Sequence, residues 1–276
     1  MRLEVMSRLK VMNGLKSCRR ILSHQINIDR ETGLFSTTRQ AARLMAVLLF
    51  IGFLSVPAAR AADQDTRLWV PVQLINPYSD AWTVSMHTEL RWQDNISEFG
   101  DLILNPAIHY HPGKSWHLSA GYKYHEKYES SSDEQDIYQE FSFNKKRGDL
   151  VTGYQLRMEQ RFIDNISGVI HRLRFLTHAS HPIREGPHYL FGHASVFFNL
   201  NDKGEGPVHG FEQSRIYFGL GRHIGSHIAI EAGYLWGYKS KRNGDDLSAH
   251  VIQLGLSYNT RAKAAPLKPN VRDSFR

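Results

Sequence analysis

The sequence predicts an all-β protein, an antiparallel transmembrane β-barrel of about 10–12 strands. Two observations lead to this fold class. An export signal lies in the N-terminal part of the chain, and beyond it apolar and polar residues alternate in segments of about ten residues. Clusters of Gly, Asn, Asp, Ser and Pro separate these segments, and no long segment shows the period of an amphipathic helix.

Residues 1–61 are expected to be a leader that ends in a secretory signal peptide. Arg39 and Arg43 precede an apolar run over residues 44–56, and Ala59-Arg60-Ala61 forms a small-x-small cleavage site. The run is too short for a membrane-spanning helix, which needs roughly 20 apolar residues. We therefore expect export from the cytoplasm and cleavage after Ala61.

The mature chain reads as one barrel over residues 62–259, followed by a polar tail over residues 260–276. The whole chain carries 34 basic and 27 acidic residues, for a net charge of +7. Ten of these bases and three of these acids fall in residues 1–61, which leaves 24 of each in the mature chain. The basic surplus belongs to the leader, so net charge gives no support for a nucleic-acid partner. Cys18, the single cysteine, also lies in the leader, which excludes a disulfide framework.

The strands follow one another along the mature chain. The clearest covers residues 81–93, where aromatic and aliphatic residues form one face and polar residues such as Glu89 and Arg91 form the other. Similar alternation occupies residues 116–125, 150–161, 169–180, 189–200, 215–220, 227–239 and 252–258. A further candidate covers residues 66–75, but Pro71 disfavours it as an interior strand. Single-chain bacterial barrels have an even number of strands, so we expect about ten or twelve strands here.

The alternation fits two architectures. A soluble β-sandwich or lipocalin-like barrel turns the apolar face inward, whereas a transmembrane barrel turns it toward lipid. Three observations favour the membrane: the polar face carries many charges, aromatic residues lie near the ends of the apolar faces, and short and long connections alternate. The expected short connections are residues 112–114, 146–148 and 225–226, and the expected long loops are 129–136, 201–210 and 239–246. This pattern predicts the cell outer membrane of a Gram-negative bacterium, with the long loops outside.

Charged residues on the polar faces are expected to point into the lumen, the interior of the barrel. They are the acids Glu89, Glu140, Glu159 and Glu231 and the bases Arg91, Lys123, Arg157, Arg161, Arg172, Arg174, Arg215 and Lys239. One interpretation is a salt-bridged network that fills a narrow barrel, because a buried charge needs a partner. The other is a narrow pore that prefers anions, because bases outnumber acids in this set.

Two His-x-Ser pairs are the candidates for enzymatic chemistry. His178 with Ser180, and His193 with Ser195, each share one face of a strand, so each imidazole could activate its hydroxyl. A lipid hydrolase would need such a pair at the bilayer surface. The alternation places both pairs on the lumen side, where ordinary polar lining is the simpler interpretation.

Three histidines are the candidates for a metal site. His109 and His111 share a face beside a turn, and hairpin pairing would bring His117 opposite His109. Three imidazoles could bind zinc or copper. No acidic residue lies near them in the sequence, so we expect polar lining of the barrel rim and no bound metal.

An ordered set of short motifs extends across the mature chain. It consists of Leu68-Trp69, Glu89-Leu90-Arg91, Gly121-Tyr122-Lys123-Tyr124, Arg157 with Arg161, Arg215-Ile216-Tyr217, Glu231-Ala232-Gly233-Tyr234 and Leu254-Gly255-Leu256-Ser257-Tyr258. In order and spacing, this set resembles the family catalogued as domain of unknown function 2490, whose members are bacterial outer-membrane barrels. The resemblance implies fold and location but no activity, since the family has none assigned. One departure is that the last strand ends at Asn259 and a polar tail follows it.

These observations predict an outer-membrane barrel without intrinsic catalysis and without a cofactor. It would be a structural or envelope component, or a narrow channel of the porin kind. The alternative is an outer-membrane lipid-modifying hydrolase that uses a His-x-Ser pair. The expected partners are outer-membrane lipid and lipopolysaccharide, the barrel assembly machinery and periplasmic chaperones, with no nucleic acid.

Overall fold

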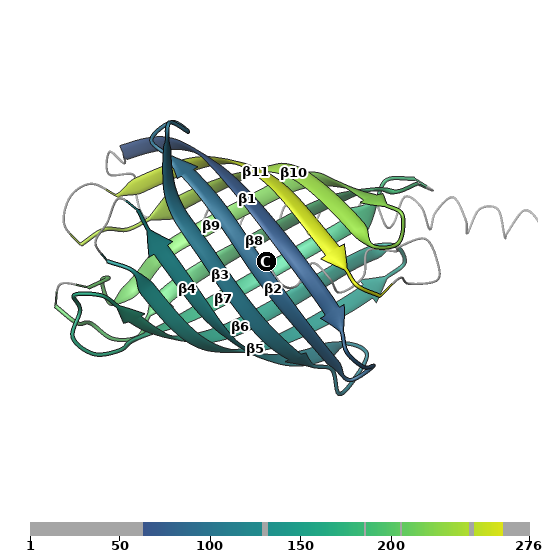
Figure 1. Cartoon of the computed structure of the whole chain (residues 1–276), viewed down its shortest axis with the longest axis horizontal. Coiled ribbons are helices and arrows are strands. Elements are labelled where there is room, and N and C mark those ends of the chain that lie inside the picture. Colours follow the sequence, from purple (N-terminus) through teal and green to yellow (C-terminus); the bar gives the residue numbers. More distant parts are fainter. Residues whose placement is uncertain (1–62, 129–131, 185, 205, 243–245, 262–276) are drawn as a thin grey trace, which may run out of the picture. The chain divides into compact units, whose positions relative to one another are not determined.

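The computed structural model describes residues 63–128, 132–184, 186–204, 206–242 and 246–261, so the expected leader lies outside the described residues. The described residues form eleven strands that close into a barrel (Figure 1). They are β1 (Asp63–Pro77), β2 (Trp82–Gln93), β3 (Glu98–Tyr110), β4 (Trp116–Lys127), β5 (Glu134–Arg147), β6 (Leu150–Ile163), β7 (Ile170–Pro182), β8 (His188–Asn199), β9 (Gly210–Ile224), β10 (Ile228–Lys239) and β11 (Leu247–Asn259). The predicted all-β barrel is confirmed.

The barrel closes through a seam between β1 and β11. Every strand pairs antiparallel with its neighbour in sequence, but β1 and β11 pair in parallel. This follows from the odd strand number, because the first and last of eleven alternating strands run in the same direction. The expectation of an even number is therefore wrong, and the candidate over residues 66–75 is a barrel strand. Pro71 is tolerated because the ladder to β11 is interrupted between Trp69 and Val72, where the missing N–H costs no hydrogen bond.

The seam register can be tested with an engineered disulfide. Gln73 and Ser257 are directly paired across the seam, at the strand spacing of about 5 Å that a disulfide accepts. With Cys18 replaced by serine, we expect Gln73→Cys with Ser257→Cys to cross-link on oxidation, measured as a mobility change of the heat-denatured chain that reductant reverses. Gln73→Cys with Gly255→Cys is the control and should not cross-link. A cross-link in the control alone would show a different register.

The two ends of the barrel differ in their connections. Residues 128–133, 164–169, 200–209 and 240–246 connect strands at one end, which we call the loop end. The opposite turn end holds tighter connections, and Gly148 and Gly225 adopt positive φ there, a conformation that favours glycine. One expectation is corrected: the loop predicted over 129–136 ends earlier, because β5 begins at Glu134.

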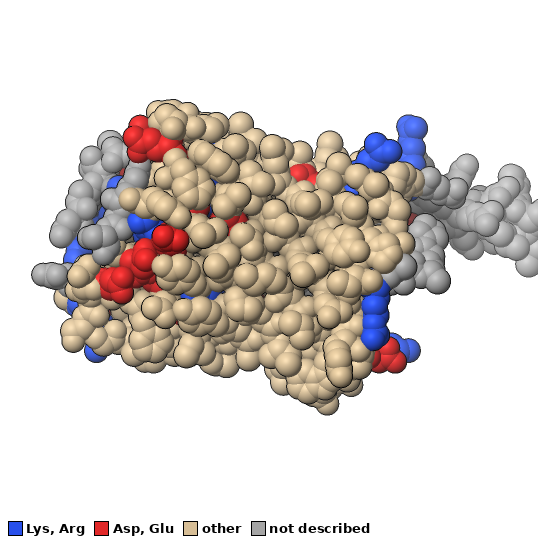
Figure 2. Space-filling model, in the orientation of Figure 1, with Lys and Arg blue, Asp and Glu red and all other residues tan. Residues whose placement is uncertain are grey.

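The outer face is apolar and the inner face is polar. Large apolar side chains such as Val84, Leu156 and Leu254 face outward and are close to half exposed. Figure 2 shows that Lys, Arg, Asp and Glu gather toward the two ends of the visible face, with a largely uncharged band between them. Such a band is the surface that a transmembrane barrel presents to lipid. Among the described residues, no helix combines the length and the apolar character needed to cross a membrane.

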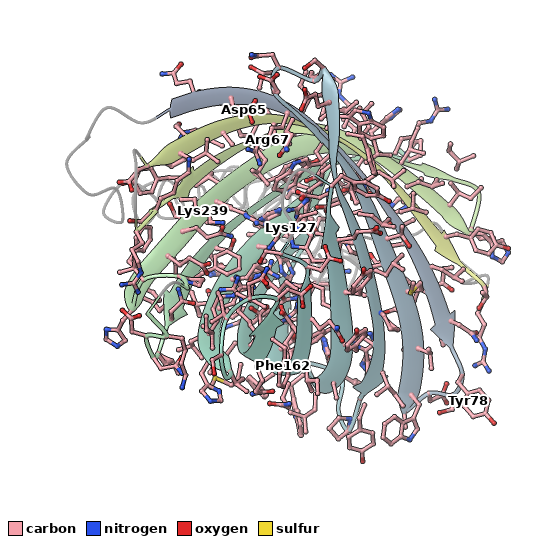
Figure 3. The ribbon with its side chains drawn as sticks, turned by 60° about the vertical axis from the view of Figure 1, so that its left-hand side comes forward. Asp65, Arg67, Tyr78, Lys127, Phe162 and Lys239 are labelled. Atoms are coloured by element: carbon pink, nitrogen blue, oxygen red, sulfur yellow. The ribbon has the colours of Figure 1, made fainter. Side chains whose placement is uncertain are left out.

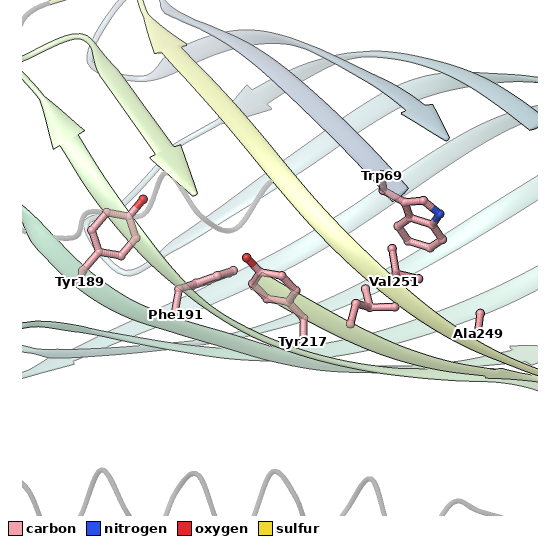
Figure 4. Packing of buried hydrophobic residues seen from close by; sticks show 7 residues of the cluster. Trp69, Tyr189, Phe191, Tyr217, Ala249 and Val251 are labelled. Carbon is pink, nitrogen blue, oxygen red and sulfur yellow. The ribbon is translucent and has the colours of Figure 1, made fainter. Parts of the chain in front are cut away.

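Aromatic side chains occupy part of the interior. Trp69, Tyr189, Phe191, Tyr217 and Val251 belong to one buried cluster that lines the wall from β8 to β1 (Figure 4). A glycine on the neighbouring strand makes room for some of these rings. Gly221 lies opposite Tyr189, and a Cβ at this position would come within 2.1 Å of the tyrosine ring. Glycines in these strands therefore serve the packing of rings inside the lumen.

Candidate functional site

The charged side chains of the lumen converge near the loop end. We call this set the charge network; its members are Lys123, Glu134, Asp136, Glu140, Arg157, Glu159, Arg161, Arg172 and Glu212. Strand register brings most of them together, because Asp136 lies opposite Arg161 and Glu159 lies opposite Arg172. Figure 3 shows Lys127, at the edge of this network, among the polar side chains inside the barrel.

Arg161 on β6 forms hydrogen bonds to carboxylates on β5 and β9. Its Nε and Nη2 each donate to one carboxylate oxygen of Glu134 at 2.9 Å, and its Nη1 donates to Glu212 at 3.0 Å. The side chains of Arg161, Glu134 and Glu212 are no more than 4% exposed. Because β7 and β8 separate β6 from β9 in the sheet, the bond to Glu212 runs across the lumen.

Arg172 makes a second link to the same carboxylate. It donates to Glu159 through Nε and to the other oxygen of Glu212, at 3.0 Å, through Nη1. Glu212 therefore receives a guanidinium on each oxygen and joins two otherwise separate parts of the wall. A buried carboxylate with two guanidinium partners has the compensation that its desolvation requires.

Glu212 is a member of the charge network that the alternation does not predict. In β9 the inward positions are odd, as at Gln213 and Arg215. The register between β8 and β9 shifts between Phe197 and Phe198, which pair with Gln213 and Phe211 and leave Glu212 as an extra residue. This bulge turns Glu212 inward. The local sequence carries no signal for this role, because the arginines that bind Glu212 lie on β6 and β7, which are not adjacent to β9.

Other acids complete the network on the β2–β5 side. Lys123 contacts Glu134 at 3.1 Å and Asp136 at 2.5 Å, and Asp101 faces His125 at 3.2 Å. Glu134 and Asp136 were expected in a loop, but both lie inside the barrel on β5. Together with Glu212, these inward carboxylates remove most of the surplus of bases on which the anion-selective pore rested.

The predicted lumen charges make further contacts, both within the charge network and outside it. Arg157 donates to Glu140 at 2.7–2.8 Å, Arg91 donates to Glu89 at 2.5 Å, and Glu231 accepts from Tyr189 at 2.6 Å. The guanidiniums of Arg174 and Arg215 each lie 5.2 Å from the ring of Phe197, and Arg215 also lies 5.0 Å from Trp69. Lys239, at the loop end of β10, interacts electrostatically with Glu212 and Glu134 of the charge network.

Both His-x-Ser pairs lie inside the barrel. His178, Ser180, His193 and Ser195 are buried, and His178 lies opposite His193 across β7 and β8. Among the described residues, neither the hydroxyl of Ser195 nor the Nδ1 of His178 has a hydrogen-bond partner. Nucleophilic catalysis requires a base in contact with the hydroxyl. Neither pair therefore has the geometry of an activated nucleophile at the lipid surface.

The three candidate metal ligands do come together. The rings of His109, His111 and His117 have centroids 5.1–6.5 Å apart. Both nitrogens of His109 are already engaged, by Ser85 at 2.8 Å and Ser119 at 2.7 Å. Within the part of the chain that the structure describes, no group of three or more His, Cys, Asp or Glu residues could hold a metal ion.

A closed barrel with an apolar outer face and a polar, charged interior defines the class of outer-membrane β-barrel proteins. Within this class, the chain belongs to the family described as protein of unknown function (DUF2490), whose profile matches residues 66–248. The resemblance found in the sequence motifs is thereby confirmed.

One relative and two solved structures are similar to this chain at low sequence identity. The chain is 27% identical over 223 residues, which cover 78% of this chain and 96% of the relative, to the uncharacterized protein MexAM1_META1p0181 of Methylorubrum extorquens. It is similar to the NanC porin structure, with 15% identity, a TM-score of 0.47, and coverage of 70% of this chain and 98% of the porin. It is also similar to LpxR from Salmonella typhimurium, with 9% identity, a TM-score of 0.41, and coverage of 64% and 83%.

Proposed function

We propose that this protein is a structural component of the bacterial outer membrane, a barrel whose lumen is closed by the charge network. The observation that carries the proposal is the bridge from β6 and β7 across the lumen to Glu212. A wide aqueous pore would leave Arg161, Arg172 and their carboxylates in contact with water. Instead, their side chains are no more than 8% exposed.

Strand number supports a closed lumen. Barrels of about eight strands have interiors that side chains can fill, whereas water-filled channels are typical of barrels with about 16 strands. The eleven strands of this barrel place it near the closed end of that range. Paired charges can fill such an interior, because each supplies a partner to the other.

The outer face and the loop end of the barrel indicate which molecules would surround it. The apolar outer face would contact outer-membrane lipid, and the loop end, which carries charged connections, would contact lipopolysaccharide. The leader would direct export and would then be cleaved. Insertion would require periplasmic chaperones and the barrel assembly machinery. No catalytic role is proposed for the His-x-Ser pairs, because a lipid substrate would lie on the other side of the barrel wall.

Planar-bilayer conductance tests the proposal. Protein purified from outer membranes should insert, as checked by the anomalous gel migration of an unheated sample, and should produce no discrete conductance steps. The reason is that the paired side chains of the charge network would block passage between the two ends. Reproducible steps from the folded protein would overturn the closed lumen and establish a narrow channel, the alternative function.

A further inference from the structure

The turn end of the barrel carries an excess of exposed basic side chains. Figure 2 shows basic side chains at the right-hand end of the visible face, which is the turn end because β1 ends there in Figure 1. The exposed bases of this end include Lys114, Lys145, Arg147, Arg184 and Arg222. The exposed acids of its described connections are Asp80 and Asp149, whereas the exposed charges of the loop end have both signs, as at Asp164 and Lys203.

Three of these bases form a patch where neighbouring strands end. We define the basic patch as Lys114, in the connection from β3 to β4, together with Lys145 and Arg147 at the end of β5. The backbone N–H of Asn144 donates to the carbonyl oxygen of Ser115 at 2.6 Å, which holds that connection beside the end of β5. All three side chains are exposed, and Lys145 and Arg147 occupy outward-facing positions of β5. The patch therefore presents positive charge at the outer rim of the turn end.

Exposed aromatic rings lie beside the basic patch on the outer wall. Strand register pairs Trp116 with Phe143 and Phe143 with Tyr154, so these rings form a row across β4, β5 and β6. Lys145 is two residues beyond Phe143 on the same face, about 7 Å farther along the strand toward the turn end. Aromatic rings concentrate where the apolar core of a membrane meets the headgroups. The row therefore indicates that boundary, and the bases of the patch lie on its headgroup side.

The chemistry of the basic patch selects a negatively charged phosphate group. A guanidinium can bind two phosphate oxygens at once, and the two ammonium groups attract the same charge. Asp149, in the turn after β5, offsets one of the three positive charges and leaves the patch positive. Long basic side chains can reach a headgroup while their apolar stems stay against the wall. A zwitterionic headgroup fits less well, because its own ammonium group repels the bases.

We propose that the basic patch binds the headgroup of an anionic phospholipid, such as phosphatidylglycerol, in the periplasmic leaflet of the membrane. The bases would contact the phosphate, and the aromatic row would contact the glycerol backbone and the first methylene groups. The choice of a phospholipid rests on the proposed orientation, in which the loop end contacts lipopolysaccharide. It does not depend on closure of the lumen, because the patch lies at the outer rim of the barrel.

Quenching of Trp116 fluorescence by brominated lipids tests this proposal. The other four of the five tryptophans are replaced with phenylalanine, and folding is checked by gel migration. The protein is reconstituted in vesicles of equal parts phosphatidylcholine and phosphatidylglycerol, with one of the two lipids brominated in its acyl chains at a time. Brominated phosphatidylglycerol should quench more strongly, with a binding constant about five times that of phosphatidylcholine, the factor that one base contributes near an anionic surface. In the unmodified chain, the ratio of the two lipids that stay bound after detergent extraction should show the same preference.

A charge-matched pair of variants tests the position of the site. The preference should disappear in the triple variant of the basic patch, Lys114→Gln with Lys145→Gln and Arg147→Gln. The control removes three exposed bases of the loop end, Lys203→Gln with Lys241→Gln and Arg242→Gln. It changes the net charge by the same amount but leaves the patch intact, so it should keep the preference for phosphatidylglycerol.

Three results would overturn the proposal. Equal quenching by the two lipids in the parent chain would mean that the patch does not select anionic headgroups. An equal loss of preference in both triple variants would assign the effect to the net charge of the protein. Displacement of brominated phosphatidylglycerol by lipid A at a lower mole fraction than by unlabelled phosphatidylglycerol would assign the patch to the outer leaflet. Conductance is measured separately, so failure here leaves the closed lumen standing.

Discussion

Replacing Arg161 with leucine is expected to destabilise the folded barrel by about 3–5 kcal/mol. The change leaves the Glu134 carboxylate without its bidentate partner and removes one of the two guanidiniums from Glu212. Both carboxylates are buried, so neither can replace the lost bonds with full hydration. Urea unfolding of the protein in lipid vesicles, followed by circular dichroism and gel migration, would measure the loss.

Arg242→Leu provides the matched control for this prediction. Arg242 also pairs with a carboxylate, Asp202, but the two side chains are 31% and 42% exposed at the loop end. The Arg242 guanidinium holds the pKa of the Asp202 carboxyl below its ordinary value. Surface pairs of this kind contribute little, so the unfolding midpoint should stay near that of the wild type. Equal losses in both variants would contradict the distinction between buried and exposed pairs.

Removal of the cross-lumen links is expected to convert a silent barrel into a conducting one. The variant replaces Glu134, Glu159, Arg161, Arg172 and Glu212 with serine, so that bridging charges are removed together with their partners. This avoids the orphaned charge that makes single substitutions costly. The shorter side chains should admit water, and the variant should show discrete conductance steps in planar bilayers.

The control for this conductance experiment removes two charged side chains that lie outside the lumen. Arg242→Ser with Asp202→Ser removes an ion pair at the loop end and should leave the barrel silent. Gel migration must show that both variants are folded. A folded variant that lacks the five network side chains and still gives no steps would locate the closure elsewhere in the lumen.

Alternation along the strands predicts which residues face inward, because successive side chains of a strand point to opposite faces. It assigns Glu89, Arg157 and Arg172 to the lumen face, and the structure buries all three. It fails at Glu212, because one extra residue at a bulge changes the face without changing the composition of the segment. It also fails at the start of β5, where Glu134 and Asp136 follow a serine-rich acidic run that is typical of a loop.

Local pattern can predict only those partners of the lumen charges that lie on adjacent strands. The pairing of Glu140 with Arg157 follows from one hairpin, so a correct hairpin register would suffice to find it. The bond from Arg161 to Glu212 joins strands that are not adjacent in the sheet. It depends on how the sheet curves and closes, which no period in the sequence records. The same holds for the seam, since pairing of β1 with β11 needs the count of all strands between them.

The parallel seam also governs how the barrel can fold. All other strand pairs are hairpins between sequence neighbours, which have low contact order, whereas the seam joins Asp63 to Leu247. The entropy of closing so long a stretch of chain must be overcome before any seam hydrogen bond forms, so the seam forms last and slowly. Until then, β1 and β11 expose unpaired edges to other chains, which makes the nearly complete sheet the species most prone to aggregate.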